Sequence, residues 1–443
     1  MALPRQTIGT VRAMVALSAI AFDRRTISPM ATLARRAACL ASGLLALSSL
    51  ACVSTAAASS SHAGATAPPT VVALHVPTGS TYAALSFVSC SSAGSCAAGG
   101  TEISGRVSRA MVATEQRGVW GPAQGVGPAL TGSTTSRIGG IACPVPGSCV
   151  AVGVYDHVAP VTGNDRYSGF LALQHGSGWS TVQPIPLMGL GAASYFITAL
   201  QCPSKNACVI LGLTNITVDA SSPFAQTWQN GKWGAAHIFS VSALGKGASV
   251  AEMALSCPSI SFCTAVGQFS GDHGSTTPLS VSMAKGKWGP LTAHKGYHST
   301  TNINELTSVS CVAPGTCVAT GQTVNKTNPL DGDPLIMSES AGRWAAPITL
   351  ASPYPAGPYA AATQMPVVSC VSDTDCSGLV TGGTAGYPIG VATMRGAGHW
   401  SVVDTLNLAK LGKYSAPSLR ALSCLTDSCV AVGSGAVGAQ GAG

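Results

Sequence analysis

A pair of cysteines with five residues between them recurs along most of this chain. In most copies an alternating run leads to the first cysteine, and the second begins a run of small apolar residues that ends at glycine. Successive first cysteines are 53 to 59 residues apart, which indicates one supersecondary unit copied seven times. The pairs are Cys90 and Cys96, Cys143 and Cys149, Cys202 and Cys208, Cys257 and Cys263, Cys311 and Cys317, Cys370 and Cys376, and Cys424 and Cys429, the last with four residues between them.

Each copy divides into four short strands joined by turns. Residues 306–311 show the period-two alternation of a first strand, and residues 263–267 show the small apolar run of a second strand. A third strand, such as residues 278–283, is followed by a glycine-containing turn and by a fourth strand that opens with tryptophan. Six of the seven tryptophans stand at this place: Trp120, Trp179, Trp233, Trp288, Trp344 and Trp400.

This pattern predicts an all-β protein, a seven-bladed β-propeller of four-stranded antiparallel blades over residues 70–443. A single blade cannot bury both of its faces, whereas blades packed around an axis cover one another and leave only short edges. The last copy stops soon after Cys429 without a tryptophan strand, and residues 70–76 precede the first copy without a unit of their own. We expect this N-terminal strand to complete the last blade, whose third strand is not evident in the sequence.

The repeat resembles those of secreted bacterial propeller-like proteins. The resemblance rests on Ser256-Cys257-Pro258-Ser259, on the run from Cys263 to Gly267, and on the later Gly-Lys-Trp turn. It covers roughly residues 70–443 and implies the propeller architecture, but it implies no activity. The sixth copy departs from the pattern at Ser377-Gly378-Leu379.

The first 58 residues have the composition of an export leader. Arg35-Arg36 precedes a small-residue and leucine-rich run over residues 37–53, and Ala56-Ala57-Ala58 offers an A-x-A cleavage site. These features suit a signal peptide that begins at Met30 and is cleaved after Ala58. We therefore expect a secreted or cell-surface protein, with residues 59–69, rich in Ser, Ala, Thr and Pro, as a flexible tether.

Three other interpretations of this leader stay open. The run that ends at Cys52 resembles a lipoprotein box with Ser in place of the expected Leu, and Arg35-Arg36 weakly resembles a twin-arginine signal. An uncleaved anchor is less favoured because the apolar run is short and rich in small residues. Elsewhere no apolar run of about 18 residues occurs, so we expect no membrane span in the mature chain.

The cysteines favour disulfides over a metal. An even set in an exported chain is typical of a disulfide framework, and seven equivalent units should each close a local bridge. A structural zinc needs four ligands, whereas each unit offers two thiolates and no recurring histidine. Redox-active thiols remain the alternative. We expect no metal site and no cofactor.

The charge of the body limits its partners. Charged residues make up 9% of the chain, against about 25% in typical soluble domains. Residues 59–443 contain 17 basic and 15 acidic residues, scattered rather than clustered. A nucleic-acid binder needs a basic stripe, so we expect none. We expect a monomer whose partner is a glycan or a protein.

Candidate binding residues gather in the variable loops between the second and third strands. Variable polar loops on a rigid scaffold are where binding usually occurs, although each residue can also be a solvated turn. An Asp331-Gly332-Asp333 run is only weak evidence for calcium, because it lacks the rest of a calcium loop. The candidates are Tyr155, Asp156, His157, Asp165, Arg166, Tyr167, Asp272, His273, Asn325, Asp331 and Asp333.

Motifs of catalysis are missing from the sequence. It contains no G-x-S-x-G, no H-E-x-x-H, no phosphate-binding loop and no sialidase-type Asp box at its tryptophan turns. We expect no catalytic residue and interpret the chain as a non-enzymatic binding or surface-interaction module. The alternative is a carbohydrate-active hydrolase or lyase that uses carboxylates on the loop face. A structural envelope protein without a small ligand is a third possibility.

Overall fold

The protein is described here by a computed structural model, and its described part is built almost entirely of strands. One 3-10 turn, η2 (Ser242–Leu244), also occurs. No helix in the described part is long and apolar enough to cross a membrane. The described residues are 15–23, 70–127, 135–158, 165–186, 194–217, 220–271, 276–294, 302–325, 328–350, 364–381, 389–395, 399–406, 414–426 and 428–437.

We number the units 1 to 7 by their cysteine pairs in chain order. Unit 1 contains β3 (Tyr82–Ser92), β4 (Ser95–Ser104), β5 (Val107–Gln116), β6 (Val119–Trp120) and β7 (Gln124–Gly125). Unit 2 contains β8 (Ser136–Ala142), β9 (Val150–Val158), β10 (Asp165–His175), β11 (Gly178–Trp179) and β12 (Gln183–Pro184). Unit 3 contains β13 (Ser194–Ser204), β14 (Ala207–Thr217), β15 (Ala220–Gln229), β16 (Lys232–Trp233) and β17 (His237–Ile238).

The later units follow the same plan. Unit 4 contains β18 (Ser249–Ser259), β19 (Phe262–Ser270), β20 (Thr276–Ala284), β21 (Lys287–Trp288) and β22 (Thr292–Ala293). Unit 5 contains β23 (Asn302–Ala313), β24 (Thr316–Asn325), β25 (Asn328–Ser340), β26 (Arg343–Trp344) and β27 (Ile348–Thr349). Unit 6 contains β28 (Gln364–Ser372), β29 (Asp375–Thr381), β30 (Ile389–Arg395) and β31 (Trp400–Leu406). Unit 7 contains β32 (Tyr414–Cys424) and β33 (Ser428–Val437), together with β1 (Val15–Asp23) and β2 (Thr70–Leu74).

Antiparallel pairing in chain order joins the first three strands of units 1 to 6, as the sequence predicts. The fourth strand differs from the prediction in units 1 to 5. There it is broken into two short pieces, such as β6 and β7, which both pair with the third strand. A parallel bridge between Thr276 and Ile303 links units 4 and 5 into one sheet, and an isolated parallel bridge between Ser108 and Thr135 lies between units 1 and 2.

The last sheet draws on both ends of the chain. Its order is β2-β1-β33-β32, so the N-terminal strand at residues 70–74 joins the last unit, as expected. The third place is taken by residues 15–23, which pair antiparallel with β33 on one side and with β2 on the other. This strand lies within the 58 residues that the sequence assigns to the leader, so a cleaved leader and this sheet exclude each other within one mature chain.

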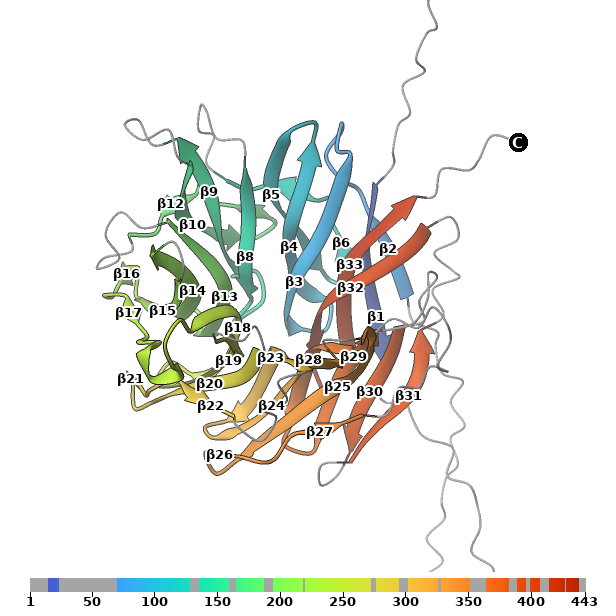
Figure 1. Ribbon diagram of the computed structural model, residues 1–443. Helices are drawn as coiled ribbons and strands as arrows, with labels where there is room; N and C mark the ends of the chain where they lie inside the picture. Colours follow the sequence, from blue (N-terminus) through green and yellow to red (C-terminus); the bar gives the residue numbers. More distant parts are fainter. Residues whose placement is uncertain are drawn as a thin grey trace, which may run out of the picture.

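Neighbouring units lie side by side around a common centre (Figure 1). Each first strand contacts the first strand of the next unit, and β32 of the last unit contacts β3 of the first. In five of these junctions the residue before a first cysteine is serine, and its hydroxyl accepts a hydrogen bond from the next unit's first cysteine N–H. These bonds run from Cys143 to Ser89, Cys311 to Ser256, Cys370 to Ser310, Cys424 to Ser369 and Cys90 to Ser423.

The core lies between the units rather than inside each one. Leu85 and Met111 of unit 1 pack with Val430 and Val432 of unit 7 in one buried cluster. This arrangement follows from the period-two pattern, because the two faces of a sheet are both apolar and each needs a neighbour.

Every predicted cysteine pair forms a disulfide, which confirms the local pairing. In each described hairpin the bridge ties the first strand to the second beside their connecting turn. The turns of units 1, 4 and 5 are tied further, because the glycine before the tryptophan strand donates to the hairpin tip, as Gly118 does to Gly94 at 3.0 Å.

Candidate functional site

Six of the predicted binding residues lie on the hairpin of unit 2. Their expected location in a loop is wrong, because β9 extends through Tyr155, Asp156 and His157, and β10 begins at Asp165. Backbone pairing brings Arg166 opposite His157 and Tyr167 opposite Asp156. The side chains of His157, Asp165 and Arg166 lie outside the described residues.

Asp156 has a structural task. It is 6% exposed, and its carboxylate accepts a hydrogen bond of 2.8 Å from the N–H of Thr135. Its own N–H donates to the Thr135 carbonyl at 2.9 Å. These two bonds fasten the start of β8 to the end of β9, so this carboxylate is engaged within the fold.

The other predicted residues do not join this group. Asp272 and His273 lie outside the described residues. Asn325 is the last residue of β24, and Asp331 and Asp333 lie on β25, where a loop is expected. Asp333 is half-buried and pairs with Thr323. Within the described part, no group of three or more His, Cys, Asp or Glu side chains could hold a metal ion.

One predicted residue does belong to a surface cluster, which we call the Arg137 cluster: Arg137, Tyr167 and Phe196. The rings of Tyr167 and Phe196 lie 4.8 Å apart between centroids. The Cζ atom of Arg137 lies 4.7 Å from the centroid of Phe196. Both aromatic rings are half-buried and Arg137 is exposed. An exposed guanidinium beside aromatic rings makes this cluster the candidate binding surface, and it carries a positive charge.

A buried tyrosine supports the cluster from below. Tyr195, next to Phe196 on β13, accepts a hydrogen bond of 2.5 Å from the N–H of Gly169 on β10. Burial raises the pKa of this phenol. Its ring meets Phe224 edge to face at 6.0 Å. The contact fixes β13 of unit 3 against β10 of unit 2, which sets Phe196 beside Tyr167.

Arg137 and Phe196 were missed from the sequence because both lie on first strands, where side chains are expected to pack. They occupy one repeat position, just before the residue that pairs with the repeated glycine. Unit 1 has Ala84 there. An arginine and a phenylalanine at a position that tolerates alanine are the signal that a comparison of the units would find.

Two carboxyl groups have raised pKa values, and both lie away from this cluster. Burial raises the pKa of Glu115 in unit 1 and of Glu339 in unit 5. Each lines a separate pocket, and neither pocket has a second carboxyl among its described lining residues. A glycosidase needs two carboxyls facing one substrate, and these two pockets do not supply such a pair.

No protein-family model matches this sequence, and a comparison with curated proteins gives no match. Solved structures are similar in three dimensions. An ulvan lyase has a TM-score of 0.49 at 11% identity, covering 79% of this chain and 91% of that one. A protein of unknown function from Dyadobacter fermentans has 0.46 at 8%, covering 82% and 97%. An α-L-arabinofuranosidase from Fusarium graminearum has 0.42 at 11%, covering 70% and 93%.

Proposed function

We propose that this protein is a secreted, monomeric seven-bladed β-propeller that binds a glycan at the Arg137 cluster without chemical turnover. The observation that carries the proposal is the exposed guanidinium of Arg137 at 4.7 Å from the ring of Phe196, with Tyr167 beside it. Aromatic rings offer the apolar faces of a sugar a flat surface, and the guanidinium offers directional donors.

The chemistry of the cluster favours a glycan that carries carboxylate or sulfate groups. Arginine presents a planar fork of N–H donors that matches two oxygens of such a group. A partner protein with an acidic surface would meet the same donors, and it is the second candidate.

Closure into a propeller is supported by the junction between the ends. The hydrogen bond from Cys90 N–H to Ser423 repeats, between the last unit and the first, the bond that joins units 6 and 7. Export is supported by the cysteines, because disulfides persist in oxidising compartments and all the described units carry one.

A glycan array probed with the wild type and with Phe196→Ala and Arg137→Gln tests the binding site. We expect wild-type binding to acidic glycans and a loss of about tenfold or more in each variant. Tyr82→Ala is the matched control, since Tyr82 is an exposed aromatic on unit 1 and lies outside the cluster. Binding that survives both cluster variants would refute the site.

A hydrolase and lyase screen on every glycan that binds separates the module from the rival enzyme. We expect no new reducing ends and no unsaturated sugar product. Turnover that depends on any carboxylate of the loop face would establish the hydrolase or lyase instead.

A further inference from the structure

At the end of the units away from the Arg137 cluster, one repeat position has side chains of different kinds in different units. It is the residue on the third strand that pairs with the tryptophan of the fourth. Unit 2 has Gln174 there, and units 1 and 5 have Glu115 and Glu339. Unit 3 has Trp228 and unit 4 has Met283.

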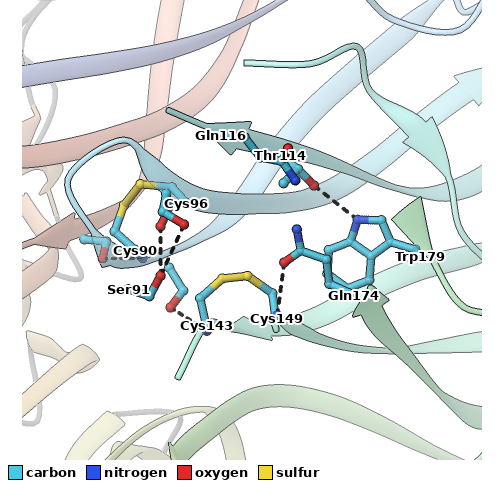
Figure 2. Close-up of a disulfide and its surroundings, with 12 residues drawn as sticks. Cys90, Ser91, Cys96, Thr114, Gln116, Cys143, Cys149, Gln174 and Trp179 are labelled. Carbon is cyan, nitrogen blue, oxygen red and sulfur yellow. Dashed lines mark hydrogen bonds between the residues drawn. A yellow bond between two sulfur atoms is a disulfide. The ribbon is translucent and has the colours of Figure 1, made fainter. Parts of the chain in front are cut away.

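Unit 2 shows how a polar side chain is satisfied at this position. The amide oxygen of Gln174 accepts from the N–H of Cys149 at 3.0 Å, and its amide nitrogen donates to the carbonyl of Gly176 at 2.7 Å. Figure 2 shows the first of these bonds beside the Cys143–Cys149 disulfide. The side-chain amide of Gln174 therefore has a hydrogen-bond partner for its oxygen and for its nitrogen.

Glutamate at the same position is left with an unmet acceptor. Glu115 is 7% exposed and Glu339 is 5% exposed, and the Oε2 atom of each is buried without a hydrogen-bond partner. An ionised carboxyl cannot donate to the turn carbonyl as Gln174 does. Burial raises the pKa of both groups, in line with this lack of partners.

Each of these carboxyls lines a pocket between two units. The pocket of Glu115 has a volume of about 290 Å³ and lies between units 1 and 7, with Trp120, the Cys90–Cys96 hairpin and Val430 in its wall. The pocket of Glu339 has a volume of about 300 Å³ and lies between units 5 and 4, with Met283 in its wall. Both are built from a unit's own disulfide hairpin and the strands of the preceding unit.

The walls are mostly apolar, and their polar side chains besides the acid are Ser423 and Ser428 in one pocket and Thr264 and Ser282 in the other. Among the described lining residues, Glu115 and Glu339 are the charged side chains of their pockets, and the cysteines there are in disulfides. Such a pocket suits a long side chain with an apolar stem and a cationic tip. Arginine and lysine have this form, and each supplies the donors that a carboxylate lacks.

We propose that these two pockets each receive one arginine or lysine side chain from a basic peptide segment of a partner protein. The carboxyl in the lining accepts hydrogen bonds from the cationic head, and the apolar part of the lining covers the methylene stem. In the pocket of Glu115, Trp120 adds an aromatic surface that suits a guanidinium. The glutamine of unit 2, already satisfied, marks that unit as one without such a site.

A tetra-arginine peptide and its tetra-citrulline counterpart, titrated calorimetrically into the full chain, test the proposal. Citrulline has the size of arginine without its charge. We expect the arginine peptide to bind and the citrulline peptide to bind at least tenfold more weakly. The double variant Glu115→Gln with Glu339→Gln should lose at least tenfold in affinity. Each single variant should still bind the arginine peptide at the pocket whose glutamate is unchanged.

Two controls keep the test specific. The glutamine variants should fold, because unit 2 already carries glutamine at this position. Glu252→Gln removes an exposed carboxylate on β18, outside both pockets, and should leave peptide binding within twofold of the wild type. Equal binding of the two peptides, equal binding by the double variant, or no binding of the arginine peptide at about 1 mM would each overturn the proposal.

Discussion

A glutamate and a glutamine at one repeat position show how a single atom changes a local environment. Gln174 accepts from a cysteine N–H and donates to a carbonyl, whereas the Oε2 of Glu115 and of Glu339 is buried without a partner. Leaving a buried polar group unpaired costs about 1–3 kcal/mol. The acid is therefore a local weakness of the free protein.

Glu115→Gln and Glu339→Gln should each raise the free energy of unfolding by about 1 kcal/mol at pH 7, because glutamine can make both bonds seen in unit 2. The folded-state pKa of each acid lies above 4.5, its value in the unfolded chain. The native state then binds the proton more tightly, so the wild type loses stability as pH rises from 4.5 through the raised pKa. The advantage of the variants should grow over that window and vanish below it, as urea unfolding at several pH values would measure.

At the level of the strand, a bulge explains the glycine that recurs after the second cysteine. In units 1 and 5 the first strand carries an extra residue at the register shift opposite this glycine. The bulge pushes a backbone carbonyl into the space of a side chain. A Cβ at Gly321 would lie 1.9 Å from the Glu305 oxygen, and one at Gly100 equally close to that of Ala84.

Gly321→Ala should cost about 3 kcal/mol or more, since the obstacle is backbone and cannot rotate away. Gly271→Ala is the matched control, because a Cβ there meets nothing within 4 Å. That substitution should change the stability by less than about 0.5 kcal/mol. Thermal or urea unfolding measures both, and a small effect at Gly321 would contradict the bulge.

On the scale of the whole molecule, the two ends of the repeat meet in one junction. Ser423 of unit 7 accepts from Cys90 of unit 1 at 3.1 Å, and Ser369 of unit 6 accepts from Cys424 of unit 7 at 2.9 Å. In a closed ring, the first of these bonds contributes as much to stability as the second. An open ring would leave Ser423 at an end.

Ser423→Ala and Ser369→Ala should therefore lower the free energy of unfolding by the same amount, about 1 kcal/mol each. Each substitution leaves a cysteine N–H at a junction between units without its hydrogen-bond acceptor. Urea unfolding of the two variants side by side gives the comparison. An effect at Ser369 with none at Ser423 would mean that the ring is open in solution.

The last sheet bears on whether the N-terminal leader is cleaved. Cleavage after Ala58 removes residues 15–23, which lie between β33 and β2 in the last sheet. From the leader composition we expect a mature chain that begins at Ser59, and mass spectrometry of the exported protein reads its first residue directly. A mature peptide that contains Arg12 or Arg24 would refute cleavage and would keep β1 in the sheet.

Much of the architecture could be predicted from the sequence because it depends on local, repeated patterns. Cys311 and Cys317 lie opposite each other across one hairpin, so their spacing alone predicts their bridge. The site was less readable. Tyr167 was chosen from a predicted loop, whereas it lies on a strand and its ring contacts Phe196 of the next unit. Asp156 was predicted as a binding residue, and its carboxylate accepts a hydrogen bond from Thr135, a contact that depends on how two strands meet.

By itself, the sequence determined the all-β class and the seven local disulfides, because period-two alternation and short cysteine loops act within a few residues. Only the tertiary structure decided which units meet, that residues 15–23 enter the last sheet, and that Glu115 and Glu339 line pockets with one carboxyl oxygen each left without a hydrogen-bond partner. The physical reason is that these properties depend on contacts between distant segments, where burial and the supply of hydrogen-bond partners are set by the neighbouring unit.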